Sequence, residues 1–245
     1  MFNSNINYYG ICLILAIMVN IIIVWLNSKR FNFDKFEIMA LIFYEIIGIF
    51  LGGKIGTILT HLNKYSSINF FKVGFSSYGC LVGLLLFIII FKIQFKVDYK
   101  ILLYILSPVF PLMYSIGKIG CFLAGCCYGI KYGSFGSIVY NYSISAPKGI
   151  SLFPIQIVES FIFLIISIYF IRKLLKLKFN DKVLGQLCIS CSISKFLLDF
   201  LRYSHYDHII SLNQIVSILF LIIGVIIYMK SKNTGYLNFK IDRGA

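Results

Sequence analysis

The sequence is poor in charged residues. Only 13% of its 245 residues are Asp, Glu, Lys or Arg, whereas 59% are hydrophobic and the mean hydropathy is +0.88. A typical soluble domain has about twice that share of charged residues. This composition excludes a soluble globular domain. Because low-complexity segments and a convincing internal repeat are also lacking, we expect a single membrane domain over residues 1–245.

Apolar runs long enough to cross a hydrocarbon core of about 30 Å recur along the chain. The sequence lacks the short alternating segments of a β-barrel, so these runs predict helices. The first run is longer than a signal-peptide core and no A-x-A-like cleavage site follows it, so we expect it to be retained. The fold class predicted is therefore an all-α polytopic membrane protein with about seven transmembrane helices. They are expected at about Tyr8–Leu26, Ile38–His61, Phe75–Phe91, Ile101–Gly125, Pro154–Leu174, Leu184–Leu201 and Ile209–Met229.

The net charge of +14 is distributed along the chain in a pattern typical of membrane topology. Of the 23 Lys and Arg residues, 15 lie in the first, third and fifth connections and the C-terminal tail, and only five lie in the other connections. The positive-inside rule then places the N-terminus outside and the C-terminus in the cytoplasm. The basic residues thus indicate orientation and no nucleic-acid partner. The remaining three cations, Lys54, Lys118 and Lys195, fall inside predicted spans.

Histidine and cysteine are not arranged as a metal site or a disulfide framework. His61, His205 and His208 lack metal-ligand spacing. Most of the seven cysteines lie in apolar spans, where cysteine acts as a small hydrophobe, and the C-x-x-C pair Cys188 and Cys191 is interpreted as packing rather than redox. No metal and no cofactor is predicted.

The exception is the stretch Gly117–Gly129, which reads G-K-I-G-C-F-L-A-G-C-C-Y-G. It places a lysine, three cysteines and four glycines at the end of a predicted span. A charge inside hydrocarbon costs roughly 2.5–3.5 kcal/mol on insertion scales, so an intramembrane lysine is a functional-site candidate. Glycines allow a backbone to approach a neighbouring helix or a ligand closely.

Polar residues from five predicted spans fall at the same, outer side of the membrane. Lys195, Asp199 and Arg202 are spaced i, i+4 and i+7, and so share one helix face. Several cations with two carboxylates at this depth can hold a phosphate ester and position an acid or base. The alternatives are simple interhelical salt bridges for the cations and an interfacial anchor for Tyr78. The residues are Lys54, Ser76, Ser77, Tyr78, Lys118, Gln156, Glu159, Lys195, Asp199 and Arg202.

Six motifs in this order resemble the prolipoprotein diacylglyceryl transferase family. They are L-G-G-K-I-G (Leu51–Gly56), S-S-Y-G-C-L-V-G (Ser76–Gly83), G-K-I-G-C-F (Gly117–Phe122), F-P-I-Q-I-V-E (Phe153–Glu159), K-F-L-L-D-F-L-R (Lys195–Arg202) and S-L-N-Q-I-V-S (Ser211–Ser217). The similarity covers about residues 40–230. It implies a seven-helix enzyme of the bacterial inner membrane that moves the diacylglyceryl group of phosphatidylglycerol onto the lipobox cysteine thiol of a prolipoprotein, releasing glycerol phosphate.

The resemblance also implies roles for particular residues. The catalytic residues implied are Tyr78, Lys118, Glu159 and Arg202. The substrate-binding residues implied are Lys54, Gly79, Gly117, Gly120, Cys121, Cys126, Gln156 and Lys195. Gln156, Glu159 and Arg202 match the family's motifs directly.

Other positions depart from the family's motifs. Lysine stands at positions 54, 118 and 195 where the family has arginine, and it lacks the planar fork that grips phosphate with two parallel hydrogen bonds. Tyr78 stands at a histidine position, Cys121 at an asparagine position and Cys126 at a glutamate position. A sister enzyme for another lipid or acceptor, with Cys126 or Cys127 as nucleophile, is therefore an alternative. A non-catalytic lipid- or peptide-binding protein and a thiol oxidoreductase are further alternatives.

Overall fold

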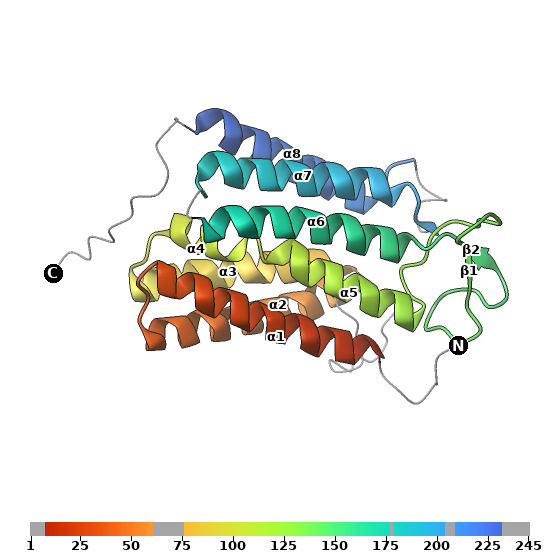
Figure 1. The fold of residues 1–245 in the computed structure, drawn as a ribbon, viewed down its shortest axis with the longest axis horizontal. Coiled ribbons are helices and arrows are strands. Elements are labelled where there is room, and N and C mark those ends of the chain that lie inside the picture. The colour runs from red at the N-terminus through yellow and green to blue at the C-terminus, as the bar shows by residue number, and fades with distance from the viewer. Residues whose placement is uncertain (1–7, 61–75, 177–178, 204–208, 232–245) are drawn as a thin grey trace. The chain divides into compact units, whose positions relative to one another are not determined.

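A computed structural model describes residues 8–60, 76–176, 179–203 and 209–231. In this part of the chain almost all regular structure is helical (Figure 1). The elements are α1 (Tyr8–Arg30), α2 (Lys35–Thr60), α3 (Ser77–Phe95), α4 (Tyr99–Leu106), α5 (Phe110–Ala124), β1 (Ile138–Val139), β2 (Ser151–Leu152), α6 (Ile155–Leu175), α7 (Asp181–Asp199) and α8 (Leu212–Lys230). The predicted all-α class is confirmed. His61, His205 and His208 lie outside the described residues.

Five helical stretches in the described part are long and apolar enough to cross a membrane: α1, α2, the stretch Tyr99–Ala124, α6 and α8. The apolar part of α3, Gly79–Phe95, is shorter. The remaining predicted span coincides with α7, whose length would suffice but whose ends carry Asp181, Lys182, Lys195 and Asp199. Five of the seven predicted spans therefore meet the criteria of length and composition, and the chain is a polytopic helical membrane protein.

The fourth predicted span is not one continuous helix. It is interrupted between Leu106 and Phe110, because Pro108 has no amide hydrogen and disfavours helical geometry at the residue before it.

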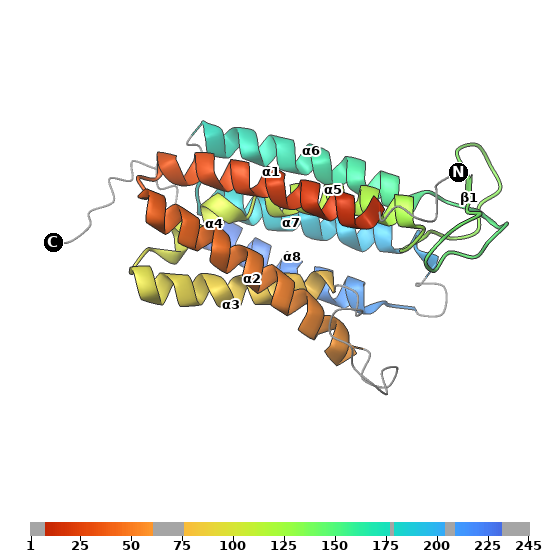
Figure 2. The same ribbon diagram turned by 90° about the horizontal axis from the view of Figure 1, so that it is seen from below.

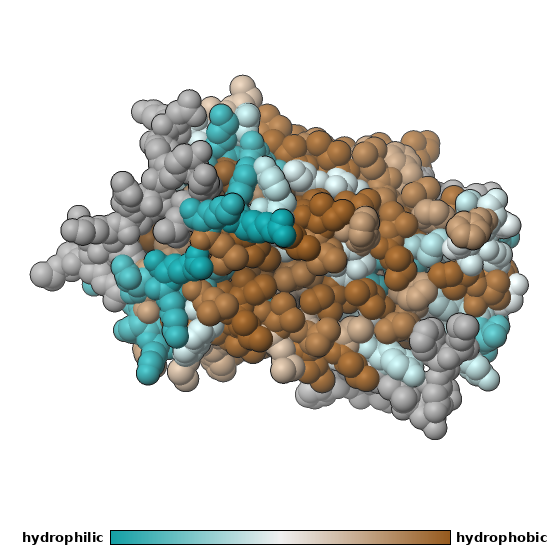
Figure 3. Space-filling model, viewed as in Figure 1, coloured by the Kyte–Doolittle hydropathy of each residue, from teal (hydrophilic) through white to brown (hydrophobic). Residues whose placement is uncertain are grey.

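Much of the helical surface is apolar. Side chains such as Ile14 and Met18 of α1 or Phe161 and Ile165 of α6 are exposed. On the face shown in Figure 3, hydrophobic residues cover most of the helical surface, and hydrophilic residues gather toward helix ends. Such contiguous apolar surface fits lipid contact.

The described residues form two compact units. Unit 1 contains the first part of α1, up to Asn20, together with residues from Leu106 onward, and unit 2 contains the described residues between Ile21 and Ile105. In unit 1, α5 packs on α6, α6 on α7 and α7 on α8, and these helices lie side by side in Figures 1 and 2. Since consecutive helices run antiparallel, the end of α5, the start of α6, the end of α7 and the start of α8 meet at one end of unit 1.

That end of unit 1 is covered by residues 125–154. They form a loop with a two-stranded antiparallel sheet, in which Ile138 pairs with Leu152. A small core of Tyr140, Ala146 and Leu152 lies beneath it. The loop thus folds around a hydrophobic cluster of its own.

Unit 2 depends on a close crossing of α2 and α3. A Cβ atom built on Gly52 would lie 2.3 Å from the carbonyl oxygen of Gly79, and one built on Gly83 would lie 2.0 Å from that of Gly48. Real Cβ atoms do not approach backbone oxygens so closely, so only glycine permits this spacing. Small residues at i and i+4 are a common device for packing membrane helices backbone to backbone.

We expect Gly52→Ala to separate α2 from α3 and to lower the free energy of unfolding by about 1–3 kcal/mol, the usual cost of overpacking. Thermal unfolding in detergent, followed by circular dichroism, measures the change. Gly133→Ala is the control, because a Cβ atom there meets nothing within 4 Å. Equal melting temperatures for the two variants would contradict the close crossing.

Candidate functional site

The centre of the candidate site is the carboxylate of Glu159, on the second turn of α6. The Nζ atom of Lys118 lies 2.6 Å from its Oε2, and the Nζ atom of Lys195 lies 2.6 Å from its Oε1. The Nε atom of Arg202 lies 3.7 Å from Oε1. Three cations from α5, α7 and the residues after α7 thus converge on one carboxylate, and four residues named from the sequence are in one cluster.

This cluster is withdrawn from solvent. The side chain of Glu159 is 0% exposed, and those of Lys118, Lys195 and Arg202 are 7%, 13% and 11% exposed. Charges buried to this extent are tolerated only when they are paired and hydrogen-bonded. Glu159 therefore holds α5, α6 and α7 together at this end of unit 1.

Tyr114 completes the cluster and was not named from the sequence. Its hydroxyl donates to Oε1 of Glu159 at 3.2 Å and accepts from Nζ of Lys195 at 2.8 Å. The ammonium groups of Lys118 and Lys195 also lie 5.0 and 5.4 Å from its ring centroid, in cation–π range. The available signal was its position one helical turn before Lys118, which places both side chains on the same face of α5.

A second carboxylate, Asp199, holds the end of α7 against the start of α8. Its Oδ1 accepts from Nδ2 of Asn213 at 2.9 Å, and Ser211 donates to its Oδ2. Ser211 is also the N-cap of α8, in a capping box with Gln214. Because Asp199 lies 3.8 Å from Nη1 of Arg202, this contact also positions the guanidinium group.

The backbone around Arg202 is held by the covering loop. Arg202 forms a β-bridge with Gly129. The backbone amide of the next residue, Ile130, donates to the carbonyl oxygen of Leu201 at 3.1 Å. The Nε atom of Arg202 is buried and makes no hydrogen bond in the described structure. Burial is the largest single effect and disfavours the charged form, but Glu159 and the other negative groups around Arg202, among them Asp199, together outweigh it and raise the pKa of Arg202, so this residue stays charged. A buried donor without a hydrogen bond is suited to receive an anionic ligand.

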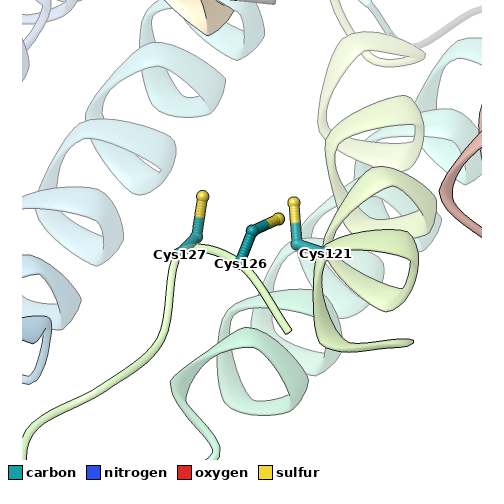
Figure 4. Close-up of side chains that lie close together, drawn as sticks. All are labelled: Cys121, Cys126 and Cys127. Atoms are coloured by element: carbon teal, nitrogen blue, oxygen red, sulfur yellow. The ribbon is translucent and has the colours of Figure 1, made fainter. Parts of the chain in front are cut away.

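Three thiols lie beside the ion cluster, where α5 passes into the loop. The Sγ atoms of Cys121, Cys126 and Cys127 all lie within 4.8 Å of one another. Figure 4 shows the three side chains projecting to the same side of the chain, with the sulfur of Cys126 directed toward Cys121. Cys127 is exposed and the other two are partly buried.

The backbone is specialised at this thiol cluster. Gly125 ends α5 in the left-handed conformation, with φ 64°, and a Cβ atom there would lie 2.6 Å from that of Ser143. Cys127 also has a positive φ, 54°, which costs a non-glycine residue about 1–3 kcal/mol and is typical of functional sites. Nε2 of Gln156 donates to the carbonyl of Cys126 at 2.8 Å and fixes the turn to α6.

The thiols also influence one another. Hydrogen bonds from Cys121 and Cys126 are the main cause that lowers the pKa of Cys127, and the positive fields of Lys118 and Arg202 lower it further. The same contacts raise the pKa of Cys126. Cys127 is therefore the most acidic of the three thiols.

Two glycines named from the sequence have different surroundings. A Cβ atom on Gly120 would lie 2.9 Å from Cβ of Cys12, so this glycine lets α1 approach α5 within unit 1. A Cβ atom on Gly117 would meet nothing within 4 Å, so no packing contact requires glycine there.

The other predicted site residues belong to unit 2. Lys54 is 4% exposed, on α2, with its Nζ atom 6.0 Å from the ring centroid of Phe50. Gly79 lies at the crossing of α2 and α3, and its amide donates to Oγ of the N-cap Ser76 at 3.2 Å. Tyr78 is in the first turn of α3, but its side chain lies outside the described residues. The roles assigned to these three residues remain predictions.

Fold and site together define a polytopic helical membrane protein with a buried cation–carboxylate cluster at one end of its helices. The family model for prolipoprotein diacylglyceryl transferase matches residues 1–230. The chain therefore belongs to the prolipoprotein diacylglyceryl transferase family, a family of bacterial multi-pass membrane transferases. The resemblance predicted from the six motifs is confirmed.

The chain is similar to relatives in three bacteria over most of its length and most of theirs. The chain is 28% identical to phosphatidylglycerol–prolipoprotein diacylglyceryl transferase 2 of Clostridium perfringens, covering 96% of this chain and 94% of the relative. It is 26% identical to the phosphatidylglycerol–prolipoprotein diacylglyceryl transferase of Clostridium tetani, over 93% of this chain and 94% of the relative. The Campylobacter hominis protein of the same name is 27% identical, covering 94% and 88%.

We expect Glu159→Gln to lower the free energy of unfolding by about 3–5 kcal/mol, because it leaves buried cations without their carboxylate. Chemical denaturation in detergent measures the change. Asp98→Asn is the matched control, since Asp98 is exposed and asparagine can still accept the hydrogen bond from the amide of Lys100. Adding Lys195→Met to Glu159→Gln removes one unpaired charge and should recover part of the loss. A double variant no more stable than Glu159→Gln alone would contradict the pairing.

Proposed function

We propose that this chain is a phosphatidylglycerol–prolipoprotein diacylglyceryl transferase of the bacterial inner, or plasma, membrane. Its lipid substrate is phosphatidylglycerol. Its acceptor is the thiol of the lipobox cysteine in the signal peptide of a prolipoprotein. No nucleic acid takes part. The relatives' names and the family membership support this proposal, and one structural observation carries it further.

That observation is the excess of buried positive charge around Glu159. Among the residues that the structure describes, the carboxylates that pair with Lys118, Lys195 and Arg202 are two, those of Glu159 and Asp199. The three cations therefore exceed the carboxylates of this cluster by one charge. The phosphate of the lipid substrate is the counterion for that charge. A dry site strengthens this attraction relative to water, because the effective dielectric is lower.

The same charges suit the reaction. The acceptor sulfur forms a bond to the terminal glyceryl carbon, while the bond from that carbon to the phosphate oxygen breaks. The electron pair leaves on the phosphate oxygen, so glycerol phosphate gains negative charge in the transition state. Lys118 and Arg202 stabilise that charge, Glu159 holds both cations in place, and Lys195 with Tyr114 orients the carboxylate.

Residues around the ion cluster complete the proposed binding site. Gln156 holds the turn that carries Cys126 and also lies 3.4 Å from the hydroxyl of Tyr140. Gly117 leaves room for a ligand, since among the described residues no atom of another segment lies within 4 Å of the position its Cβ atom would take. In unit 2, the resemblance to the family assigns Lys54 and Gly79 to substrate binding, and we assign proton relay to Tyr78 because it stands at the family's histidine position.

Transfer is tested with the purified chain in phosphatidylglycerol liposomes and a lipobox peptide, and the peptide mass is measured. We expect a diacylglyceryl adduct. Removing the cation in Lys118→Ala should lower the rate by a factor on the order of 10²–10³, the usual effect of losing a preorganised charge-stabilising donor. Lys118→Arg should stay active, because guanidinium also binds phosphate.

Lys148→Ala is the control for net charge, since Lys148 is exposed on the loop at the same end of unit 1. It should transfer at the parent rate. Absence of an adduct, with the Clostridium perfringens relative active in parallel, would contradict the proposed reaction. The lipids of cells that express the chain would then be profiled for the substrate of a sister enzyme.

Orientation is tested with an impermeant maleimide on intact spheroplasts. Phe135→Cys, at a fully exposed loop position, should be labelled from outside. Lys176→Cys, in the basic connection after α6, should be labelled only after lysis, and the parent chain gives the background. The reverse pattern would contradict the predicted topology.

A further inference from the structure

The thiols of Cys121, Cys126 and Cys127 have the spacing of a metal site. Zinc binds thiolate sulfur at about 2.3 Å in tetrahedral geometry, which places two sulfurs about 3.8 Å apart. All three Sγ atoms already lie within 4.8 Å of one another without a metal. A shift of about 1 Å at sulfur, well within side-chain rotation, closes the remaining difference.

The backbone holds these thiols in position. Two adjacent residues seldom direct their side chains to one side, but the left-handed conformation of Cys127 allows it here. Gly125 closes the last turn of α5, which brings Cys126 back toward Cys121. Gln156 anchors the carbonyl of Cys126 to α6. These backbone contacts bring the three thiol side chains together. Cysteines that only fill space in a hydrophobic core would not require such contacts.

The electrostatic surroundings fit a thiolate-bound dication. One Zn²⁺ with three thiolates carries one net negative charge. Lys118 acts electrostatically on Cys121 and Cys127, and Arg202 on Cys127. Both cations also contact Glu159, so they act on the ion cluster and on the thiols together. The exposure of Cys127 also leaves one side of the cluster accessible.

Neither hydrophobic packing nor a disulfide accounts for as much of this geometry. Buried cysteines packed as small hydrophobes do not need an exposed member or a positive φ. A disulfide joins only two sulfurs, leaves the third without a role and requires an external oxidant.

We infer that Cys121, Cys126 and Cys127 form a three-thiolate site for one Zn²⁺ ion whose fourth position binds the acceptor thiol. This inference rests on the proposed function for the identity of the acceptor. Three protein ligands with one open position are typical of catalytic zinc, whereas structural zinc has four.

Atoms and charge balance in the proposed step. The acceptor thiol replaces the water on zinc and loses its proton to solvent, which gives a zinc-bound thiolate at neutral pH. That sulfur then bonds to the glyceryl carbon as the carbon–oxygen bond breaks, and the electron pair leaves with glycerol phosphate. The thioether product is a weaker ligand and is replaced by water. No oxidant or reductant is required, and no side-chain base of matched pKa is needed.

Zinc content is measured first, independently of activity. The full chain is purified in detergent under reducing conditions, loaded with Zn²⁺, passed through gel filtration and analysed by mass spectrometry of the metal. We expect one equivalent of zinc per chain. Cys121→Ser, Cys126→Ser and Cys127→Ser should each lose it, and Cys80→Ser should keep it, since Cys80 is a partly buried cysteine outside the cluster.

The open position is tested with Co²⁺ in place of zinc. Three thiolate ligands give charge-transfer absorption in the near ultraviolet, and the visible bands should shift when the lipobox peptide is added. A peptide with serine in place of the cysteine should cause no shift. Thermal unfolding of each variant without metal shows whether a loss of binding reflects misfolding.

The outcomes separate this inference from the proposed function. A chain that holds no zinc yet transfers diacylglyceryl in the presence of chelator overturns the zinc site and leaves the transferase intact. Zinc bound by the three cysteines with no adduct on the peptide overturns the transferase and the acceptor role. Zinc retained equally by all cysteine variants overturns the assignment of the ligands.

Discussion

The structure of unit 1 depends on the ionised carboxylate of Glu159. It is fully buried and contacts three cations, from α5, from α7 and from the residues after α7, so these segments and α6 share one electrostatic centre. Each ion would be costly to bury alone, since the effective desolvation penalty is several kcal/mol per charge. Only their joint presence makes the arrangement stable. The same residues are the ones that the proposed reaction uses, so folding and function depend on one set of contacts.

The loop after α5 connects that centre to the thiol cluster. A glycine cap ends α5, a left-handed backbone conformation at Cys127 lets its side chain project to the same side as the other two, and a β-bridge joins Gly129 to Arg202. The buried cations and the three thiols therefore lie at the same end of the same helices. The proposed reaction joins a thiol to the carbon of a phosphate ester, and the proposals assign the phosphate to the cations and the acceptor thiol to the cysteine cluster.

At positions 118 and 195, where the resemblance implies arginine in the family, lysine keeps the positive charge. A lysine makes a point contact rather than a bidentate one, and around Glu159 two lysines each take a separate oxygen of the carboxylate. Tyr114 adds a hydroxyl and an aromatic face between them. One arginine would supply two hydrogen bonds from its planar guanidinium group, whereas here the hydrogen bonds come from several residues. Arg202 remains as the guanidinium group of the cluster.

The sequence alone determined the class of the protein and most of its helices. Apolar runs, sparse charge and the placement of Lys and Arg are one-dimensional signals that hydrocarbon thickness imposes, so they predicted the all-α membrane fold. Lys118, Glu159 and Lys195 stood out because charge inside a span is expensive, and Arg202 because its spacing places it on one helix face with Lys195 and Asp199. Only the tertiary structure decided that the three cations share the carboxylate of Glu159, that Tyr114 and Asp199 complete the cluster, and that three cysteines converge. Such contacts depend on how helices rotate and where the loop turns, which side-chain packing across distant segments determines and local pattern does not.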